Sequence, residues 1–130
     1  MAKPSVRLGK VQLQIMQILW RDGEATARQI TEELCARSPI AHSTVQTLLR
    51  KMEDKGAVAH EQKDRTFVYR PVYREVEVRE SATQDLLSRV FNGSVYGLVS
   101  HLIRNEQVPS EELARLRELI DEAAQKEDPR

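Results

Sequence analysis

The fold is decided by residues 42–56, HSTVQTLLRKMEDKG, and by the residues that follow them, 57–71, AVAHEQKDRTFVYRP. In the first segment the apolar side chains recur with the helical period of about 3.6 residues. They form one stripe, which consists of Val45, Leu48, Leu49 and Met52. Gly56 follows where a left-handed residue commonly ends a helix. The pattern predicts a helix from about His42 to Lys55 with one buried face.

The second segment changes from the helical period to an alternation of apolar and polar residues, which is typical of strands. Two short strands are expected at about residues 57–61 and 66–70. The turn between them carries the basic residues Lys63 and Arg65. The segment therefore predicts a β-hairpin with a positively charged tip.

Two further helices are expected before this stretch. A wide apolar arc over residues 10–21 predicts a helix that several neighbours cover. Thr26 and Gln29 have the spacing of a capping box, so a second helix is expected over about residues 27–36, with Cys35 as a small core residue near its end. Three helices followed by a basic hairpin are the order of a winged helix-turn-helix, in which the last helix enters the major groove of DNA.

Three more helices are expected after the hairpin, each with a single apolar stripe. They begin near Arg74, Ser94 and Ser110. They are too short to close a substantial core, so a second copy of the chain is expected to cover the stripes. The expected interface residues are Val95, Leu98, Val99, Leu102, Leu113, Leu116 and Ile120. The fold class is therefore mostly α-helical with a small hairpin wing, divided into a winged helix-turn-helix (1–71), a helical dimerisation domain (72–125) and a tail (126–130).

The charge distribution supports two unlike parts. The chain of 130 residues has 20 basic and 20 acidic residues and no net charge. Residues 1–71 hold 12 basic and 8 acidic residues, a net charge of +4, and residues 72–130 hold 8 basic and 12 acidic residues, a net charge of −4. Such asymmetry favours a nucleic-acid-binding lobe joined to a separate partner lobe.

Several classes of function are not expected from this composition. A single cysteine forms no internal disulfide and fits a reducing cytosol. His42, His60 and His101 are too far apart in the sequence to predict a metal site. No apolar run reaches the roughly 18 residues of a membrane span, so a cytoplasmic protein without membrane insertion is expected. No phosphate-binding loop, nucleophile elbow or carboxylate pair is present, so neither an enzyme nor a cofactor is expected.

The outer face of the helix over residues 42–55 carries the candidate binding groups. Hydroxyl, amide and guanidinium groups hydrogen-bond to base edges and phosphates, and the face presents Ser43, Gln46, Thr47, Arg50 and Lys51. Ser43 and Gln46 also have capping-box spacing, and the remaining side chains on this face and in the turn could simply be solvated. A second class of function, a winged-helix module for protein–protein assembly, would favour exposed Leu or aromatic residues on this face.

Short motifs extend in order along nearly the whole chain. They are Leu8-Gly-x-x-x-Leu13-x-Ile15-Met16-x-Ile18-Leu19-Trp20, Thr26, Ala41-x-x-Thr44-Val45-x-Thr47-Leu48-Leu49, Lys55-Gly56, Tyr69-Arg70-Pro71, Phe91-Asn92-Gly93-Ser94, Leu98-Val99 and Glu111-Glu112-Leu113-x-x-Leu116. The set resembles the penicillinase repressor family, also called BlaI/MecI/CopY. The resemblance implies a homodimeric transcriptional repressor on a palindromic operator. It implies base contacts from Ser43, Thr44, Gln46 and Thr47 and phosphate contacts from Arg50, Lys51, Lys63 and Arg65.

The resemblance also implies how repression ends. In the β-lactam branch of the family, which regulates antibiotic resistance, a membrane-bound zinc protease senses the drug and triggers cleavage inside the dimerisation lobe. The staphylococcal cut falls between Asn and Phe, and the alignment places His101-Leu102 there, so a different protease preference or a different signal is expected. The copper-responsive branch has paired Cys-x-Cys motifs, which this chain lacks, so a copper sensor is not expected.

Overall fold

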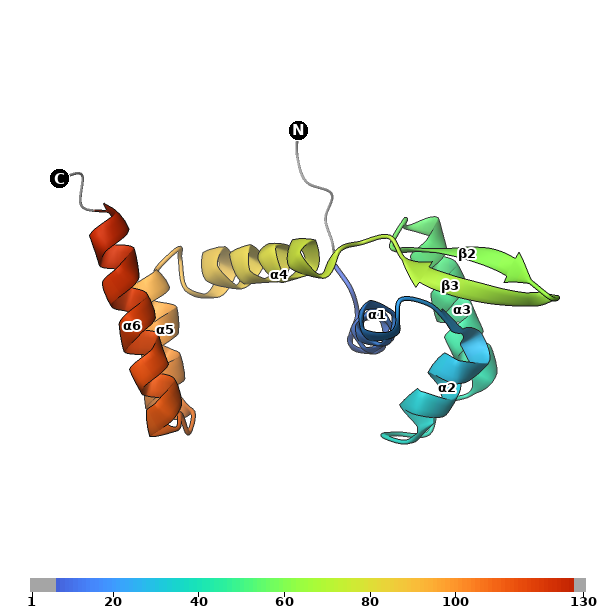
Figure 1. Ribbon diagram of the computed structural model, residues 1–130, viewed down its shortest axis with the longest axis horizontal. Helices are drawn as coiled ribbons and strands as arrows, with labels where there is room; N and C mark the ends of the chain where they lie inside the picture. The colour runs from blue at the N-terminus through green and yellow to red at the C-terminus, as the bar shows by residue number, and fades with distance from the viewer. Residues whose placement is uncertain (1–6, 128–130) are drawn as a thin grey trace. The chain divides into compact units, whose positions relative to one another are not determined.

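The computed structural model describes residues 7–127, which form six helices and a three-stranded sheet (Figure 1). The elements are α1 (Lys10–Asp22), β1 (Ala25–Thr26), α2 (Ala27–Cys35), α3 (His42–Asp54), β2 (Val58–Lys63), β3 (Thr66–Pro71), α4 (Glu75–Val90), α5 (Val95–Asn105) and α6 (Ser110–Glu127). The mostly helical fold with a hairpin wing is confirmed. The chain divides into two compact units, the first ending at Asp85 and the second beginning at Leu86.

The first unit has the only buried core in the described part of the chain. The apolar arc of α1 packs against the inner faces of α2 and α3 and against the sheet. The core residues are Ile15, Met16, Ile18, Leu19, Ala25, Ile30, Leu34, Val45, Leu49, Met52, Ala57, Val58 and Tyr69. At about 1.5–3 kcal/mol for each fully buried large side chain, this cluster supplies the main stabilisation of the unit.

The sheet has the antiparallel order β1-β3-β2, and sequence analysis had anticipated only the two strands of the hairpin. β1 pairs Ala25 with Tyr69 and Thr26 with Val68, which ties the connection between α1 and α2 to the wing. A strand of two residues is too short to show any alternation, so no sequence pattern could reveal it. In Figure 1 the hairpin of β2 and β3 extends past α3.

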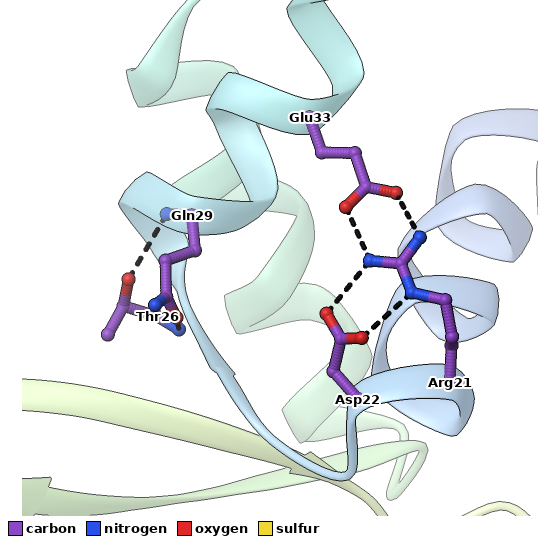
Figure 2. A network of polar contacts seen from close by, with 5 residues as sticks. All are labelled: Arg21, Asp22, Thr26, Gln29 and Glu33. Atoms are coloured by element: carbon purple, nitrogen blue, oxygen red, sulfur yellow. Dashed lines mark hydrogen bonds and ion pairs between the residues drawn. The ribbon is translucent and has the colours of Figure 1, made fainter.

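The helix ends in the first unit follow the sequence signals. The Gln29 backbone N–H donates to the Thr26 hydroxyl at 3.1 Å, and the Thr26 backbone N–H donates to the Gln29 side chain at 2.8 Å, which confirms the capping box (Figure 2). Gly56 has a φ of +88°, and the next N–H, of Ala57, donates to the Met52 carbonyl at 2.8 Å. This bond closes α3 with the left-handed cap that the glycine predicted.

The expectation for Cys35 was wrong: its side chain is exposed. The buried residues of α2 are Ile30 and Leu34, which lie four positions apart on one face. Cys35 follows Leu34 and is rotated by about 100° away from that face. Its Sγ donates to the Ile40 carbonyl at 3.2 Å.

An ionic network joins the end of α1 to α2 (Figure 2). The Arg21 guanidinium donates to both carboxylate oxygens of Glu33, at 2.7 Å for Nη1, and to both oxygens of Asp22, each at 2.8 Å. These hydrogen bonds hold the pKa of Glu33 and the pKa of Asp22 below their ordinary values and raise the pKa of Arg21. The network links α1 to α2 through two residues that lie 12 positions apart in the sequence.

We expect this network to make stability depend on pH below neutrality. A carboxyl whose pKa is lower in the folded chain adds stability above its ordinary value, 4.5 for Glu33, and loses it as the pH falls through the lowered folded value. Glu33→Gln should therefore be slightly less stable than wild type near pH 7, with a difference that shrinks below about pH 4.5. Urea unfolding at both pH values checks this. Glu32→Gln, at an exposed acid on the same helix, is the control, and a pH-independent difference for Glu33→Gln would contradict the prediction.

The second unit contains α5 and α6, and none of its described side chains is buried. Large apolar residues stay open to solvent, among them Val95 (61% exposed), Tyr96 (77%) and Leu119 (61%). α6 continues through Glu127, so residues 126 and 127 are helical, and the rest of the expected tail lies outside the described residues. No described helix is both long enough and apolar enough to span a membrane.

Candidate nucleic-acid interface

The buried stripe of α3 leaves its opposite face open to solvent. Val45, Leu49 and Met52 are fully buried, and Leu48 packs partly against the core. The exposed side chains are Ser43, Thr44, Gln46, Thr47, Arg50 and Lys51. All six α3 residues predicted to contact DNA therefore lie on the accessible side of one helix.

The start of α3 resolves an alternative that the sequence left open. The N-cap of α3 is Ala41, and no side chain caps the helix, so Ser43 and Gln46 do not form a capping box. The Thr47 hydroxyl donates to the Ser43 carbonyl at 3.0 Å. A hydroxyl has one hydrogen, so Thr47 can only accept a hydrogen bond from a partner outside the helix. The side chains of Ser43 and Gln46 stay available for binding.

The wing is held against the end of α3 by His60. Its Nδ1 lies 2.7 Å from the nearer carboxylate oxygen of Glu53, and its ring stacks on Phe67 with centroids 4.1 Å apart. Burial, with the Glu53 carboxylate nearby, raises the pKa of the neighbouring Tyr69. These contacts fix the position of the hairpin relative to the exposed face of α3.

The two basic residues at the tip of the wing have different surroundings. The turn consists of Asp64 and Arg65, with φ values of +50° and +69°, which is the backbone signature of a two-residue type I′ hairpin. Lys63 lies 3.4 Å from the Glu24 carboxylate, so an acid partly neutralises it. Within residues 7–127 no acid lies at ion-pair distance from Arg65. Arg65 is therefore the stronger anion-binding candidate of the two.

Arg65 occupies a backbone conformation that glycine adopts more readily. We expect Arg65→Gly to stabilise the chain by about 0.5 kcal/mol. The substitution removes about 1–2 kcal/mol of left-handed strain, and the greater entropy of glycine in the unfolded chain costs about 0.5–1 kcal/mol of stability. Thermal unfolding measures the change. Lys63→Gly, at a strand position with no positive φ, is the control and should be destabilising. An unchanged or lower midpoint for Arg65→Gly would show that the turn is not strained.

A hollow of about 360 Å³ lies between three elements of the first unit. Arg28 lines it from the first turn of α2, His42 and Gln46 from α3, and Arg65 and Phe67 from the wing. Arg28 was not predicted from the sequence, and His42 was weighed only for a metal site, which its sequence spacing does not favour. Arg28 had a signal, because it follows the N-cap residue Thr26 by two residues and helix N-termini attract anions. His42 had no such signal, because its place in the hollow depends on how α3 packs against α2 and the wing.

The hollow and the face of α3 form one electropositive surface. Among the described residues, no acid lies within ion-pair distance of the four cations on it, which are Arg28, Arg50, Lys51 and Arg65. The described residues also contain no group of three or more potential metal ligands. Unpaired cations beside hydroxyl and amide groups are typical of a surface that binds a nucleic-acid backbone and base edges.

The predicted residues of the second unit lie on α5 and α6 and are half-buried or exposed. Those that are exposed are Val95, Leu102, Leu113 and Ile120, and those that are half-buried are Leu98, Val99 and Leu116. Tyr96 and Leu119, which are among the most exposed apolar side chains, were not among the predicted interface residues. His101 and Leu102 lie inside α5, where the His101 carbonyl accepts a bond from the Asn105 side chain at 2.9 Å.

Comparisons with known proteins match both units. The family model described as penicillinase repressor matches residues 8–122. The penicillinase repressor of Bacillus licheniformis is 28% identical over 116 residues, covering 89% of this chain and 91% of that protein. The transcriptional regulator BlaI of Mycobacterium tuberculosis is 32% identical over 118 residues, covering 89% and 84%. The solution structure of monomeric BlaI from Bacillus licheniformis in complex with the blaP half-operator has a TM-score of 0.50 at 28% identity, covering 58% of this chain and 93% of that one.

Proposed function

Because the chain belongs to the penicillinase repressor family, whose members are DNA-binding transcriptional repressors, we propose that it represses transcription as a homodimer on a palindromic operator. Residues 1–71 are the proposed DNA-binding domain and residues 72–125 the dimerisation domain. The observation that carries the proposal is the exposed α3 face, whose cations have no acid at ion-pair distance among residues 7–127. Regulation of antibiotic resistance of the penicillinase or methicillin type is the proposed setting.

In this proposal α3 is the recognition helix in the major groove. Ser43, Thr44, Gln46 and Thr47 contact base edges, because hydroxyl and amide groups at the N-terminal half of such a helix meet the bases. Phosphate contacts come from Arg50, Lys51, Lys63 and Arg65. Lys63 contributes less than Arg65, because Glu24 competes for its ammonium group. The structure of DNA-bound BlaI supports DNA as the partner.

The second unit supports the homodimer. An isolated α5–α6 pair that buries no side chain has little hydrophobic stabilisation of its own. A second copy presents the same apolar side chains about a two-fold axis, which is the usual geometry of a homodimer. Two N-terminal domains would then meet two half-sites of one operator, about one or more helical turns apart.

Relief of repression is proposed to act on this same unit. A cut at or near His101-Leu102 by a membrane-bound sensor protease would divide α5 and lower the affinity of the two copies for each other. The peptide bond lies inside a helix, so a protease needs α5 to open locally before it can bind an extended substrate. The weak packing of the unit supports such opening.

The alternative of a protein–protein assembly module has no support from α3. That function needs large apolar side chains on the outer face of the helix, and the exposed residues there are polar or charged. The polar face favours DNA.

A footprint on the promoter of the chain's own gene tests the proposal. The full chain is expected to protect a region that contains two symmetry-related half-sites, at concentrations that leave unrelated DNA unprotected. Protection of one isolated half-site would contradict the homodimer. Equal affinity for every duplex would contradict sequence-specific repression.

A separate experiment tests proteolytic relief. Adding a β-lactam to cells that produce the chain should yield two fragments cut within α5, and an intact chain in derepressed cells would contradict proteolytic relief.

A further inference from the structure

His42 lies at the N-terminal end of the proposed recognition helix. It is the first residue of α3, it is open to solvent, and its ring lines the hollow that Arg28 and Arg65 also line. Gln46 follows four residues later, so the two side chains share one face of the helix. His42 therefore extends the face of Gln46 by one turn toward the N-terminus of α3.

A hydrogen bond from another helix fixes the orientation of the His42 ring. The Thr31 hydroxyl on α2 donates to the Ala27 carbonyl at 2.7 Å, which uses its single hydrogen. The same oxygen lies 3.1 Å from Nδ1 of His42. With the hydroxyl hydrogen directed at Ala27, this oxygen accepts at His42, and Nδ1 then carries the hydrogen of that bond. In the neutral ring the other nitrogen, Nε2, is then an acceptor.

Nε2 has no hydrogen-bond partner within the described part of the chain. The amino groups of adenine and cytosine are the hydrogen-bond donors that base edges present in the major groove. A phosphate offers only acceptors. Arg28 and Arg65, which line the same hollow and have no ion-pair partner in the described part of the chain, provide the donors that a phosphate needs. The hollow thus combines an acceptor next to Gln46 with two flanking cations.

We propose that His42 reads one base pair of each half-site by accepting a hydrogen bond through Nε2 from an adenine or cytosine amino group, with Thr31 as its positioning residue. The inference rests on the proposed DNA-binding function of α3. It adds His42 to the residues that determine sequence specificity, and Thr31 as the residue that orients the His42 ring. The choice of acceptor follows from the Thr31 bond alone, since a free ring could present either tautomer.

Selection from a pool of duplexes with a randomised segment tests the proposal on the full chain. For wild type we expect a symmetric motif with an adenine or cytosine preference at the pair that His42 faces. His42→Phe, which keeps a ring without nitrogens, should lower that preference about fivefold to tenfold and leave the other positions unchanged. His42→Gln, whose amide oxygen can occupy the place of Nε2, should retain it, whereas His42→Asn, which reaches only the place of Nδ1, should lose it.

The Thr31 variants test the positioning role separately. Thr31→Val removes the acceptor for Nδ1 and should weaken the same single preference, while Thr31→Ser keeps the hydroxyl and should restore it. Thermal unfolding of each variant, and the unchanged remaining positions of the motif, control for a general loss of structure.

The outcomes separate the two proposals. If wild type enriches no motif, the proposed function fails and this inference fails with it. If wild type enriches a motif that His42→Phe leaves intact, only the reading by His42 is overturned. If His42→Phe weakens binding to all sequences equally, His42 is a backbone contact, which also overturns it.

Discussion

Leu116→Asp is expected to yield a monomer whose affinity for a two-half-site operator is lower by about 100-fold or more. Leu116 lies half-buried on the apolar stripe of α6, in the unit that buries no side chain of its own. A charge there must be desolvated for two copies to associate. The large effect arises because the second domain of a dimer binds its half-site as an intramolecular event. Sedimentation and gel-shift titration measure the two parts of the effect.

Two controls separate dimerisation from DNA contact. Ala114→Asp adds the same charge to α6 on the side opposite Leu116, and it should remain a dimer with wild-type affinity. A duplex with a single half-site should bind Leu116→Asp as well as it binds one wild-type domain. A Leu116→Asp variant that sediments as an unaltered dimer would refute the proposed interface.

Gln46→Ala is expected to weaken operator binding by a comparable amount, because a dimer contains the contact twice. A bidentate base contact contributes about 1–3 kcal/mol, so losing two of them weakens operator binding by roughly 30-fold to 10⁴-fold. Binding to random DNA should change little. The variant should remain a dimer, since Gln46 is exposed in the first unit. Competition titration between operator and random duplexes measures the specificity ratio.

Matched variants make this result interpretable. Gln17→Ala removes an exposed amide from α1, outside the proposed interface, and should leave the ratio unchanged. Arg50→Ala should weaken binding to operator and random DNA alike. It should also reduce the slope of log affinity against log salt concentration by about two for the dimer, because each copy loses one phosphate contact. Equal losses on both kinds of DNA for Gln46→Ala would contradict base reading.

The helices of the first unit were predictable because local and tertiary signals agree there. The apolar stripe of α3, the capping box at Thr26 and the left-handed cap at Gly56 each report a local interaction that the structure contains. Such agreement between propensity, pattern and packing is typical of foldable sequences. The exposed face of α3 followed directly, because a helix with one buried stripe must present its other side to solvent.

The features that escaped prediction depend on contacts between distant segments. β1 exists only because Ala25 and Thr26 pair with β3, and the Arg21–Glu33 pair joins residues on two different helices. The hollow arises where three elements meet, so the sequence could place Arg28 in the first turn of α2 but could not bring it together with His42. The hairpin was predicted but the two-residue length of its turn was not, because Arg65 adopts a positive φ where glycine is the usual residue.

The absence of buried side chains from the described second unit bears on how the repressor responds to its own abundance. For a homodimer whose association supplies the missing core, the occupied fraction of an operator rises with the square of chain concentration below the dimer dissociation constant. Halving the concentration of the chain then reduces operator occupancy about fourfold when that concentration is well below the dimer dissociation constant. A modest dilution at cell division, or partial removal of chains, would shift transcription sharply. In the proposed homodimer, the sparse packing of α5 and α6 would thus make the regulatory response steep.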